Sequence, residues 1–305
     1  MQVQELFRPI ADYQDLCGEG PLWDSSRSAL FWTDMTARQF YCYSWAEKQS
    51  ATICTGLEIC GFALNEPNGF VLVNGAGIWT WDANDEPVPV ATEFEGIACR
   101  MNDCIADPRG RLLAGSCFYD PHDEKYPLGH LMRVDHDGSV QILDEGIQLA
   151  NGLGFSPDEQ TLYFSDSAAR VIYAYDYKPD FGTVHQRRIF ARIPLEEGLP
   201  DGLTVDAEGF VWSAQWFGSC IVRYDPDGRV ERRVAVPAKQ TSALAFGGPD
   251  LTDIFVTSAH RSDALPLAPP NYDSHCGYIG GKLFQGNLEI AGKPEFRCRI
   301  RGSRT

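Results

Sequence analysis

The chain has 305 residues, a formal net charge of −16 and a pI near 4.7. So acidic a chain argues against binding to nucleic acids or anionic membranes, because affinity for both depends on clustered Lys and Arg. The ten cysteines form no CxxC pair, which argues against a zinc or iron–sulfur centre built from thiolates. No apolar run approaches the roughly 20 residues needed to cross a bilayer, and the first residues lack a secretory pattern. We therefore expect a soluble, cytoplasmic protein.

A short hairpin pattern recurs six times along the chain, at intervals of 41 to 50 residues. Each copy has an apolar run, a turn rich in Pro, Asp, Asn and Gly, and a second run of aromatic and β-branched residues. The copies begin at Glu19, Cys60, Asn102, Asn151, Asp201 and Ser242. This period is typical of four-stranded blades, and a single such sheet cannot bury both of its faces. We therefore predict an all-β fold, a six-bladed β-propeller.

The repeat runs through almost the whole chain without a linker or a low-complexity stretch, so we predict one propeller domain over residues 1–305. A closed ring needs a joint. We predict that the N-terminal run 3–9 pairs with the C-terminal segment 282–300 in a blade shared by both ends. Since a closed ring needs no partner for its stability, we expect a monomer.

Four of the six copies begin with a residue that carries a side-chain oxygen: Glu19, Asn102, Asn151 and Asp201. In a propeller, residues at the same phase of the repeat meet around one end of the central channel, so these side chains are expected to converge. Carboxylate and amide oxygens suit hard cations such as Ca²⁺, Mg²⁺ or Mn²⁺, and Fe²⁺ and Zn²⁺ are alternatives. The competing interpretation is that Asn-Gly and Asp-Gly are plain turn signals. Turn residues should occur in every copy, whereas two copies begin with Cys60 and Ser242, so a metal site is favoured.

Four stretches resemble, in order and spacing, the signature motifs of the senescence marker protein/gluconolactonase/luciferin-regenerating enzyme-like family of six-bladed propeller lactonases. They are Gly18-Glu-Gly-Pro-Leu-Trp23, Arg100-Met-Asn-Asp103, Ala150-Asn-Gly-Leu-Gly-Phe155 and Pro200-Asp-Gly-Leu-Thr-Val-Asp206. The similarity extends over residues 15–300. It implies that Glu19, Asn151 and Asp201 bind one divalent metal ion, with Ca²⁺ as the first choice and Zn²⁺, Mn²⁺, Mg²⁺ or Fe²⁺ as alternatives.

The resemblance also implies a substrate-binding set. Arg100 and Asn102 fall where family members contact substrate oxygens, and Asp120 falls where they place a substrate-binding acid. The chain departs from the family pattern just before Asp120, because Cys-Phe-Tyr at 117–119 replaces the small and acidic residues usual there. The loop that follows, 121–127, is this protein's own. The role of the 117–130 loop and the identity of the substrate therefore stay open.

The predicted function is a metal-dependent sugar lactonase that hydrolyses an aldonolactone of the gluconolactone, galactonolactone or pentonolactone type. A metal ion polarises the lactone carbonyl, and Asp201 is the candidate base that takes a proton from water and returns it to the ring oxygen. Arg100 and Asn102 would orient hydroxyls and share the charge of the tetrahedral intermediate. The alternatives are a promiscuous metal-dependent esterase or phosphotriesterase, and a calcium-binding regulatory protein without turnover.

Other prominent residues are assigned packing roles. Trp216 is among the tryptophans expected to pack between blades. Cys17 and Cys104, each two residues from a lead residue, are expected to point to the opposite face of their strands.

Overall fold

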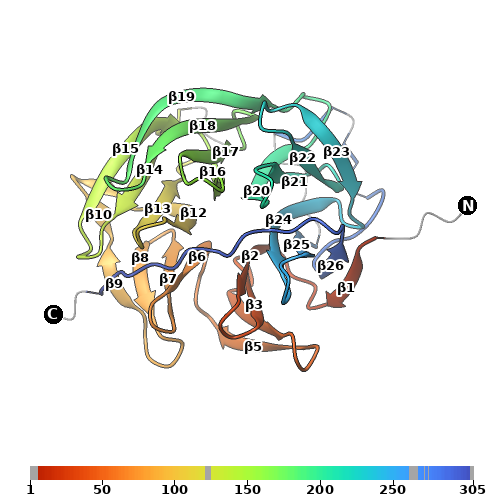
Figure 1. Cartoon of the computed structure of the whole chain (residues 1–305), viewed down its shortest axis with the longest axis horizontal. Coiled ribbons are helices and arrows are strands. Elements are labelled where there is room, and N and C mark those ends of the chain that lie inside the picture. Colours follow the sequence, from red (N-terminus) through yellow and green to blue (C-terminus); the bar gives the residue numbers. More distant parts are fainter. Residues whose placement is uncertain (1–5, 121–124, 261–266, 271, 274, 303–305) are drawn as a thin grey trace, which may run out of the picture.

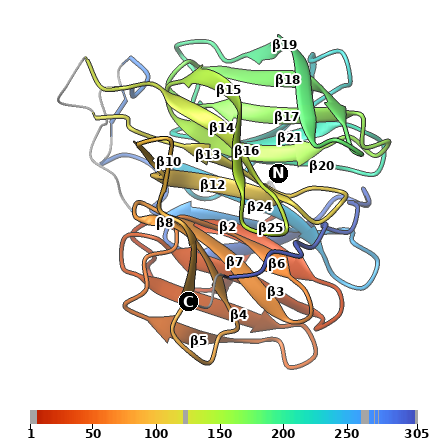
Figure 2. The same cartoon turned by 90° about the vertical axis from the view of Figure 1, so that its left-hand side faces the viewer.

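The computed structural model describes residues 6–120, 125–260, 267–270, 272–273 and 275–302. Six four-stranded antiparallel sheets surround a central axis in this part of the chain (Figure 1). Figure 2 shows the first blade and the fourth blade on opposite sides of that axis. The predicted all-β, six-bladed propeller is confirmed. Within the described ranges, no helix is long and apolar enough to cross a membrane.

The first three blades use the N-terminal half of the chain, and each orders its strands from the channel outwards (Figure 1). Blade 1 contains β2 (Gly18–Asp24), β3 (Ala29–Asp34), β4 (Gln39–Ser44) and β5 (Gln49–Thr55). Blade 2 contains β6 (Gly61–Asn65), β7 (Gly69–Asn74), β8 (Gly77–Trp81) and β9 (Val88–Ala91). A small hairpin follows, of β10 (Glu93–Phe94) and β11 (Ile97–Ala98). Blade 3 contains β12 (Met101–Ala106), β13 (Leu112–Ser116), β14 (Gly129–Val134) and β15 (Val140–Ile147).

The remaining blades follow the same order. Blade 4 contains β16 (Ala150–Phe155), β17 (Thr161–Asp166), β18 (Val171–Lys178) and β19 (Thr183–Arg192). Blade 5 contains β20 (Leu199–Val205), β21 (Val211–Trp216), β22 (Cys220–Tyr224) and β23 (Val230–Ala235). Blade 6 contains β24 (Gln240–Gly247), β25 (Asp253–Ala259), β26 (Leu283–Asn287) and, as its outermost strand, β1 (Arg8–Ala11).

The ring is closed by pairing of the two ends of the chain, as predicted, but over a shorter stretch. β1 pairs antiparallel with β26, from Arg8 opposite Gln285 to Ala11 opposite Leu283. Of the predicted N-terminal run, residues 3–5 lie outside the described residues, and the observed strand begins at Arg8. The prediction for 282–300 was wrong beyond Asn287, where the chain leaves the blade.

Residues 288–302, which we call the C-terminal strap, cross the face of the ring opposite the strand starts (Figure 1, dark blue). The strap is held by backbone hydrogen bonds to hairpin turns of several blades. The Cys298 N–H donates to the Leu64 carbonyl at 2.7 Å, and the Arg299 N–H donates to the Gly110 carbonyl at 2.8 Å. Cys298 is fully buried. The strap therefore covers one end of the channel and leaves the other end for a site.

Among the residues that the structure describes, the hydrophobic core forms six clusters, and each lies between two adjacent blades. Between blades 1 and 2, for example, Phe40 and Phe70 meet edge to face with ring centroids 5.3 Å apart. Between blades 5 and 6, Trp212 meets Phe246 at 6.0 Å. Since both faces of every blade are covered by its neighbours, the innermost strands are fixed around the channel.

Candidate active site

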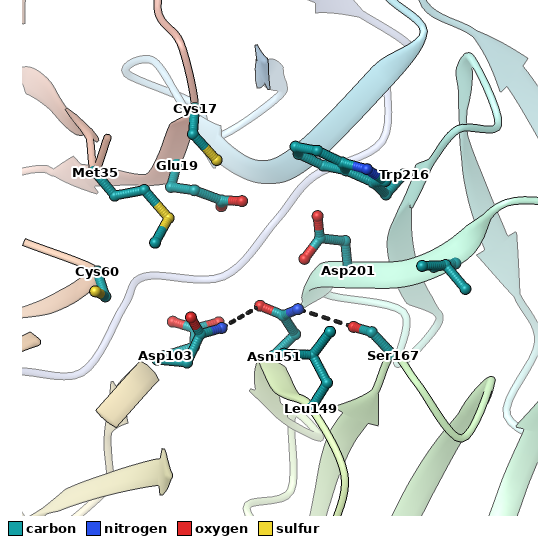
Figure 3. A pocket seen from close by; sticks show the side chains of 12 residues that line it. Cys17, Glu19, Met35, Cys60, Asp103, Leu149, Asn151, Ser167, Asp201 and Trp216 are labelled. Atoms are coloured by element: carbon teal, nitrogen blue, oxygen red, sulfur yellow. Dashed lines mark hydrogen bonds between the residues drawn. The ribbon is translucent and has the colours of Figure 1, made fainter. Parts of the chain in front are cut away.

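A cavity of about 210 Å³ opens at the end of the channel where the innermost strands begin (Figure 3). The four oxygen-bearing lead residues of the repeats line it: Glu19, Asn102, Asn151 and Asp201. Each stands within the first three residues of its strand, in β2, β12, β16 and β20. The other lining residues are Cys17, Met35, Cys60, Asp103, Leu149, Ser167, Leu199 and Trp216. The convergence expected from the repeat phase is therefore present in the structure.

An irregularity near the start of each of these four strands helps to direct the side chains towards the axis. The register of pairing shifts between Glu19 and Leu22, and similar shifts occur in β12, β16 and β20. Gly20 lies within the shift in β2 and has a φ of 56°, a conformation that glycine adopts at little cost. Bulges of this kind re-aim side chains and are common next to active sites.

Glycine follows Asn151 and Asp201 because the inner strands approach each other closely. A Cβ atom on Gly202 would lie 2.4 Å from the Cβ of Ala243, and one on Gly152 would lie 2.3 Å from a backbone nitrogen of β20. Neither position has room for a side chain. The Asn-Gly pair lies inside β16 and the Asp-Gly pair lies inside β20. The interpretation of these two pairs as turn signals is therefore wrong.

A chain of hydrogen bonds fixes the amide groups at the cavity (Figure 3). The Nδ2 of Asn102 donates to the Oδ1 of Asn151 at 2.8 Å, and the Nδ2 of Asn151 donates to the Oγ of Ser167 at 2.8 Å. The Ser167 hydroxyl in turn donates to the carbonyl of Pro200, the residue before Asp201, at 2.6 Å. The network therefore connects blades 3, 4 and 5, and it orients the carbonyl oxygen of Asn151 away from Ser167.

The carboxyl groups at the cavity repel one another, and Asp201 is buried while Glu19 and Asp103 are half-buried. Burial raises the pKa of Glu19 well above its usual range, and the charges of Asp201 and Asp103 raise it further. Burial and the charge of Asp103 raise the pKa of Asp201 in the same direction. Burial also raises the pKa of Asp103 to about 6, although its carboxylate accepts a hydrogen bond of 2.7 Å from the Cys104 N–H. The site thus brings several carboxyl groups together where poor solvation and mutual repulsion disfavour their charged forms.

This donor set fits a hard divalent cation. Glu19 and Asp201 supply carboxylate oxygens, and the Oδ1 of Asn151 has a second lone pair besides the one that accepts from Asn102. A cation between the two carboxylates would remove the repulsion that raises both pKa values. No group of three or more His, Cys, Asp and Glu side chains suited to a metal occurs among the described residues. A cation between Glu19 and Asp201 would need the amide oxygen of Asn151 as a third donor.

Two of the residues assigned to substrate binding do not line the cavity. Arg100 is exposed, and its guanidinium carbon lies 5.7 Å from the centroid of the Phe118 ring. Asp120 is also exposed, and residues 121–124 of the loop after it lie outside the described residues. The roles of Arg100 and Asp120 in substrate binding stay predictions.

The sequence analysis missed several residues that line the cavity. Cys17 was expected to point away from it, but residues two apart in an extended chain share a face, so Cys17 lies on the same side as Glu19. Trp216 was assigned to packing between blades, and its ring lines the cavity instead. Ser167 comes from the turn after β17, where no repeat signal marks it. The spacing of Cys17 could have revealed its position, whereas nothing in the sequence marks the other two.

The fold and the site define a class of protein: a six-bladed propeller with acidic and amide side chains gathered at the open end of its channel. The chain belongs to the SMP-30/Gluconolactonase/LRE-like family, whose sequence model matches residues 17–260. This confirms the family resemblance found in the sequence motifs.

Two curated relatives match over most of their length. The chain is 33% identical over 292 residues to the pentonolactonase XacC of Haloferax volcanii. The matched region covers 96% of this chain and 98% of the relative. It is 31% identical over 268 residues to a 6-deoxy-6-sulfogluconolactonase of Pseudomonas putida, covering 85% and 89%. Among solved structures, regucalcin from Agrobacterium tumefaciens, described as a calcium-binding protein, superposes with a TM-score of 0.83 at 27% identity, covering 96% of this chain and 97% of that one.

Proposed function

We propose that the protein is a metal-dependent hydrolase that opens a sugar lactone to the corresponding aldonic acid. The observation that carries the proposal is the cavity itself, which is lined by a buried carboxylate, a half-buried carboxylate and an oriented amide. The lactonase relatives support a hydrolase that acts on lactone bonds, and their substrates support a small sugar lactone as the partner. Gluconolactone, galactonolactone and the pentonolactones remain the candidate substrates.

Glu19, Asn151 and Asp201 are the residues that would hold the cation. Their hard oxygen donors and the likeness to a calcium-binding regucalcin favour Ca²⁺ first, with Zn²⁺, Mn²⁺, Mg²⁺ and Fe²⁺ as alternatives. When bound, such a cation polarises a carbonyl oxygen and lowers the pKa of a nearby water.

Asp201 is the candidate general base. Its carboxylate faces the cavity, so one oxygen can accept a proton from water and return it to the ring oxygen as the ester bond breaks. Glu19 and Asp103 are the other carboxylates beside it in the cavity.

Asn102 has a narrower role than the sequence analysis gave it. Its Nδ2 donates both to the Asn151 Oδ1 and to the Ala150 carbonyl, the latter at 2.7 Å, so both amide hydrogens are in use. Only its Oδ1 is left for a substrate, and that oxygen accepts hydrogen bonds. We therefore propose that Asn102 orients a substrate hydroxyl and holds Asn151, and that it does not stabilise an oxyanion.

The test is a pH-indicator assay of metal-stripped protein against a panel of aldonolactones, with each divalent metal added back in turn. We expect acid release that requires both a metal and a lactone. Asp201→Ala should abolish metal binding and turnover, whereas Arg100→Ala should leave the metal bound and mainly raise KM. Equal metal affinity in wild type and Asp201→Ala would contradict the site, and tight calcium binding without hydrolysis would favour a binding protein.

Asp120→Ala tests the weakest assignment in the substrate-binding set, and unchanged kinetics would remove Asp120 from it. We also propose that residues 1–305 act as one domain and as a monomer. A single cooperative unfolding transition and a monomeric mass in solution are the expected results.

A further inference from the structure

The cavity wall has a composition that a fully hydroxylated sugar does not match. Its polar residues sit at the strand starts around the channel. The rest of the described lining consists of Met35, Leu149, Leu199, the ring of Trp216 and the two thiols of Cys17 and Cys60. Buried thiols behave as small apolar groups. A ligand bound here would therefore meet apolar side chains that lie between the polar ones around the cavity (Figure 3).

The hydrogen-bond donors of the polar side are largely in use. Both amide hydrogens of Asn102 have acceptors, and one amide hydrogen of Asn151 is donated to Ser167. The Ser167 hydroxyl donates to the Pro200 carbonyl. The free oxygens of Glu19 and Asp201 are assigned to the cation. Few donors are therefore left for the oxygen atoms of a substrate, and the acceptors that remain are the Oδ1 of Asn102 and the carboxylate of Asp103.

Trp216 supplies an unused donor. Its indole N–H is buried and has no hydrogen-bond partner among the described residues, although its ring lines the cavity. Buried tryptophan N–H groups usually find an acceptor, and a ligand in the cavity would bring one next to this ring. One oxygen of a lactone ring or one hydroxyl is enough to satisfy it.

The size of the cavity restricts the ligand further. A volume of about 210 Å³ has room for one small sugar ring. Every hydroxyl that such a ring turns towards the wall loses its partners in water and gains none, whereas a methyl or methylene group there gains apolar contact.

We propose that this site selects sugar lactones with a deoxygenated edge, such as deoxy-sugar lactones, over fully hydroxylated ones, and that Trp216 donates a hydrogen bond to the bound lactone. The inference rests on the proposed lactonase function and names the substrate class within it. In the bound lactone, the carbonyl group faces Glu19 and Asp201, and the methyl or methylene group packs against an apolar residue of the lining, of which Met35 is the candidate.

The test compares matched lactones that differ in one hydroxyl group. L-rhamnono-1,4-lactone and L-mannono-1,4-lactone form one pair, and L-fucono-1,4-lactone and L-galactono-1,4-lactone form another. We expect kcat/KM of the metal-loaded enzyme to be about tenfold higher for the deoxy member of at least one pair, because an unpaired buried hydroxyl costs about a factor of ten or more. An equal or higher kcat/KM for the hydroxylated member of both pairs would overturn the inference and leave the lactonase function intact. If the enzyme hydrolysed none of these four lactones and no aldonolactone of the panel, the proposed function would be overturned, and this inference with it.

Two variants locate the effect on the wall. Met35 is half-buried, so Met35→Gln replaces an apolar wall residue with an amide of similar shape at a position that tolerates it. We expect the variant to lower the ratio of kcat/KM between deoxy and hydroxylated lactones several-fold, while the matched control Met35→Leu keeps that ratio. An unchanged ratio in Met35→Gln would exclude the wall as its origin.

Trp216→Phe keeps an aromatic ring and removes the donor. We expect kcat/KM to fall about tenfold for both members of a pair, with the ratio between them unchanged and the metal affinity unchanged. Wild-type kinetics in Trp216→Phe would overturn the hydrogen bond from Trp216 to the substrate.

Discussion

The two ends of the innermost strands carry buried carboxylates in opposite circumstances. At the cavity end, Glu19 in β2 and Asp201 in β20 form no ion pair with any described residue. At the strap end, the same repeats place Asp24, Asp107 and Asp206 in hairpin turns, and each of these is fully buried. The same residue type at two ends of one strand thus faces two environments.

Each of these three carboxylates at the strap end forms an ion pair with an arginine. Asp24 pairs with Arg27 at 2.6 Å, and Asp206 pairs with Arg223 at 2.7 Å. Burial alone would raise the pKa of Asp24, but hydrogen bonds from Ser26 and Arg27 lower it to about 2. Arginine therefore neutralises the buried acid at each of these three turns. Glu19 and Asp201 have no such partner among the described residues, and the proposed cation would supply one.

Asp107 follows the same rule at the strap end of blade 3. It pairs with Arg111 at 2.6 Å and accepts a hydrogen bond of 2.5 Å from the hydroxyl of Tyr177 in blade 4. These contacts stabilise the junction of two blades. Nothing comparable supports Glu19, whose carboxylate accepts one hydrogen bond of 3.3 Å from the neighbouring Gly20 N–H.

Removing an arginine at the strap end should have the largest effect on stability. Arg223 is 4% exposed, donates twice to Asp206 and lies over the Phe210 ring at 3.7 Å. Arg223→Ala leaves the Asp206 charge buried without its partner, so we expect the free energy of unfolding to fall by about 3–5 kcal/mol. Urea unfolding followed by tryptophan fluorescence measures the change.

Arg229→Ala in the same blade is the matched control. Arg229 is 73% exposed and pairs with Asp227 in a surface turn, so its loss should change stability by about 0.5 kcal/mol or less. Similar losses in Arg223→Ala and Arg229→Ala would contradict the distinction between compensated buried acids and surface pairs.

Asp15, which lies just before β2, should make the free energy of unfolding depend on pH. Burial and the charge of Asp34 raise the pKa of Asp15 to about 7, although the Trp32 N–H donates to it at 3.2 Å. The folded state therefore holds this proton more tightly than the unfolded state, whose pKa is near 3.8. The resulting stabilisation is complete below about pH 4 and is lost as the pH rises through 7, with an upper bound of about 4 kcal/mol.

Asp15→Asn removes that proton equilibrium. We expect the free energy of unfolding of the wild type, relative to the variant, to fall between pH 4.5 and pH 7.5. The exposed Asp12, which pairs with Lys282, provides the control, and Asp12→Asn should leave the wild-type pH dependence nearly unchanged. The same slope in wild type and Asp15→Asn would show that Asp15 ionises normally.

The cavity acids should behave in the opposite way to those at the strap end. Asp201→Asn removes one of the mutually repelling buried carboxyls, so the metal-free protein should gain about 0.5–2 kcal/mol of stability at pH 7 while metal binding is lost. Thermal unfolding of metal-stripped wild type and variant measures the first effect, and calcium titration calorimetry measures the second. Destabilisation of the metal-free protein would mean that Asp201 is a structural acid.

The repeat made much of this arrangement predictable from sequence. Because blades impose a fixed phase, the lead positions of Glu19, Asn151 and Asp201 are enough to predict that they meet, and the structure places them in one cavity. The runs of aromatic and β-branched residues also predict the strands, since such residues occupy both faces of buried blades.

Features set by packing between distant segments could not be predicted. The glycine of Asp-Gly at Gly202 reads as a turn in sequence, and only the approach of Ala243 shows that it is a packing requirement. The strap after Asn287 has no strand pattern to follow, because its path is fixed by hydrogen bonds to turns of other blades. Metal and substrate roles of the cavity residues stay predictions, as does the single domain.

The last contrast lies within one blade, between two buried serines. Ser167 accepts the hydrogen bond that orients Asn151, whereas the Oγ of Ser165, two residues earlier, is buried without a hydrogen-bond partner in the described structure. Ser167→Ala leaves the Asn151 amide held by Asn102 alone, so its carbonyl oxygen is no longer fixed towards the site. We expect calcium affinity to weaken about tenfold, which is the loss of about one hydrogen bond. Ser165→Ala should keep wild-type affinity, because it removes a hydroxyl that orients nothing. Calcium titration calorimetry on both variants decides the matter: equal affinities would show that Asn151 needs no support from Ser167, and a loss confined to Ser167→Ala would show that this hydrogen bond prepares the site for its cation.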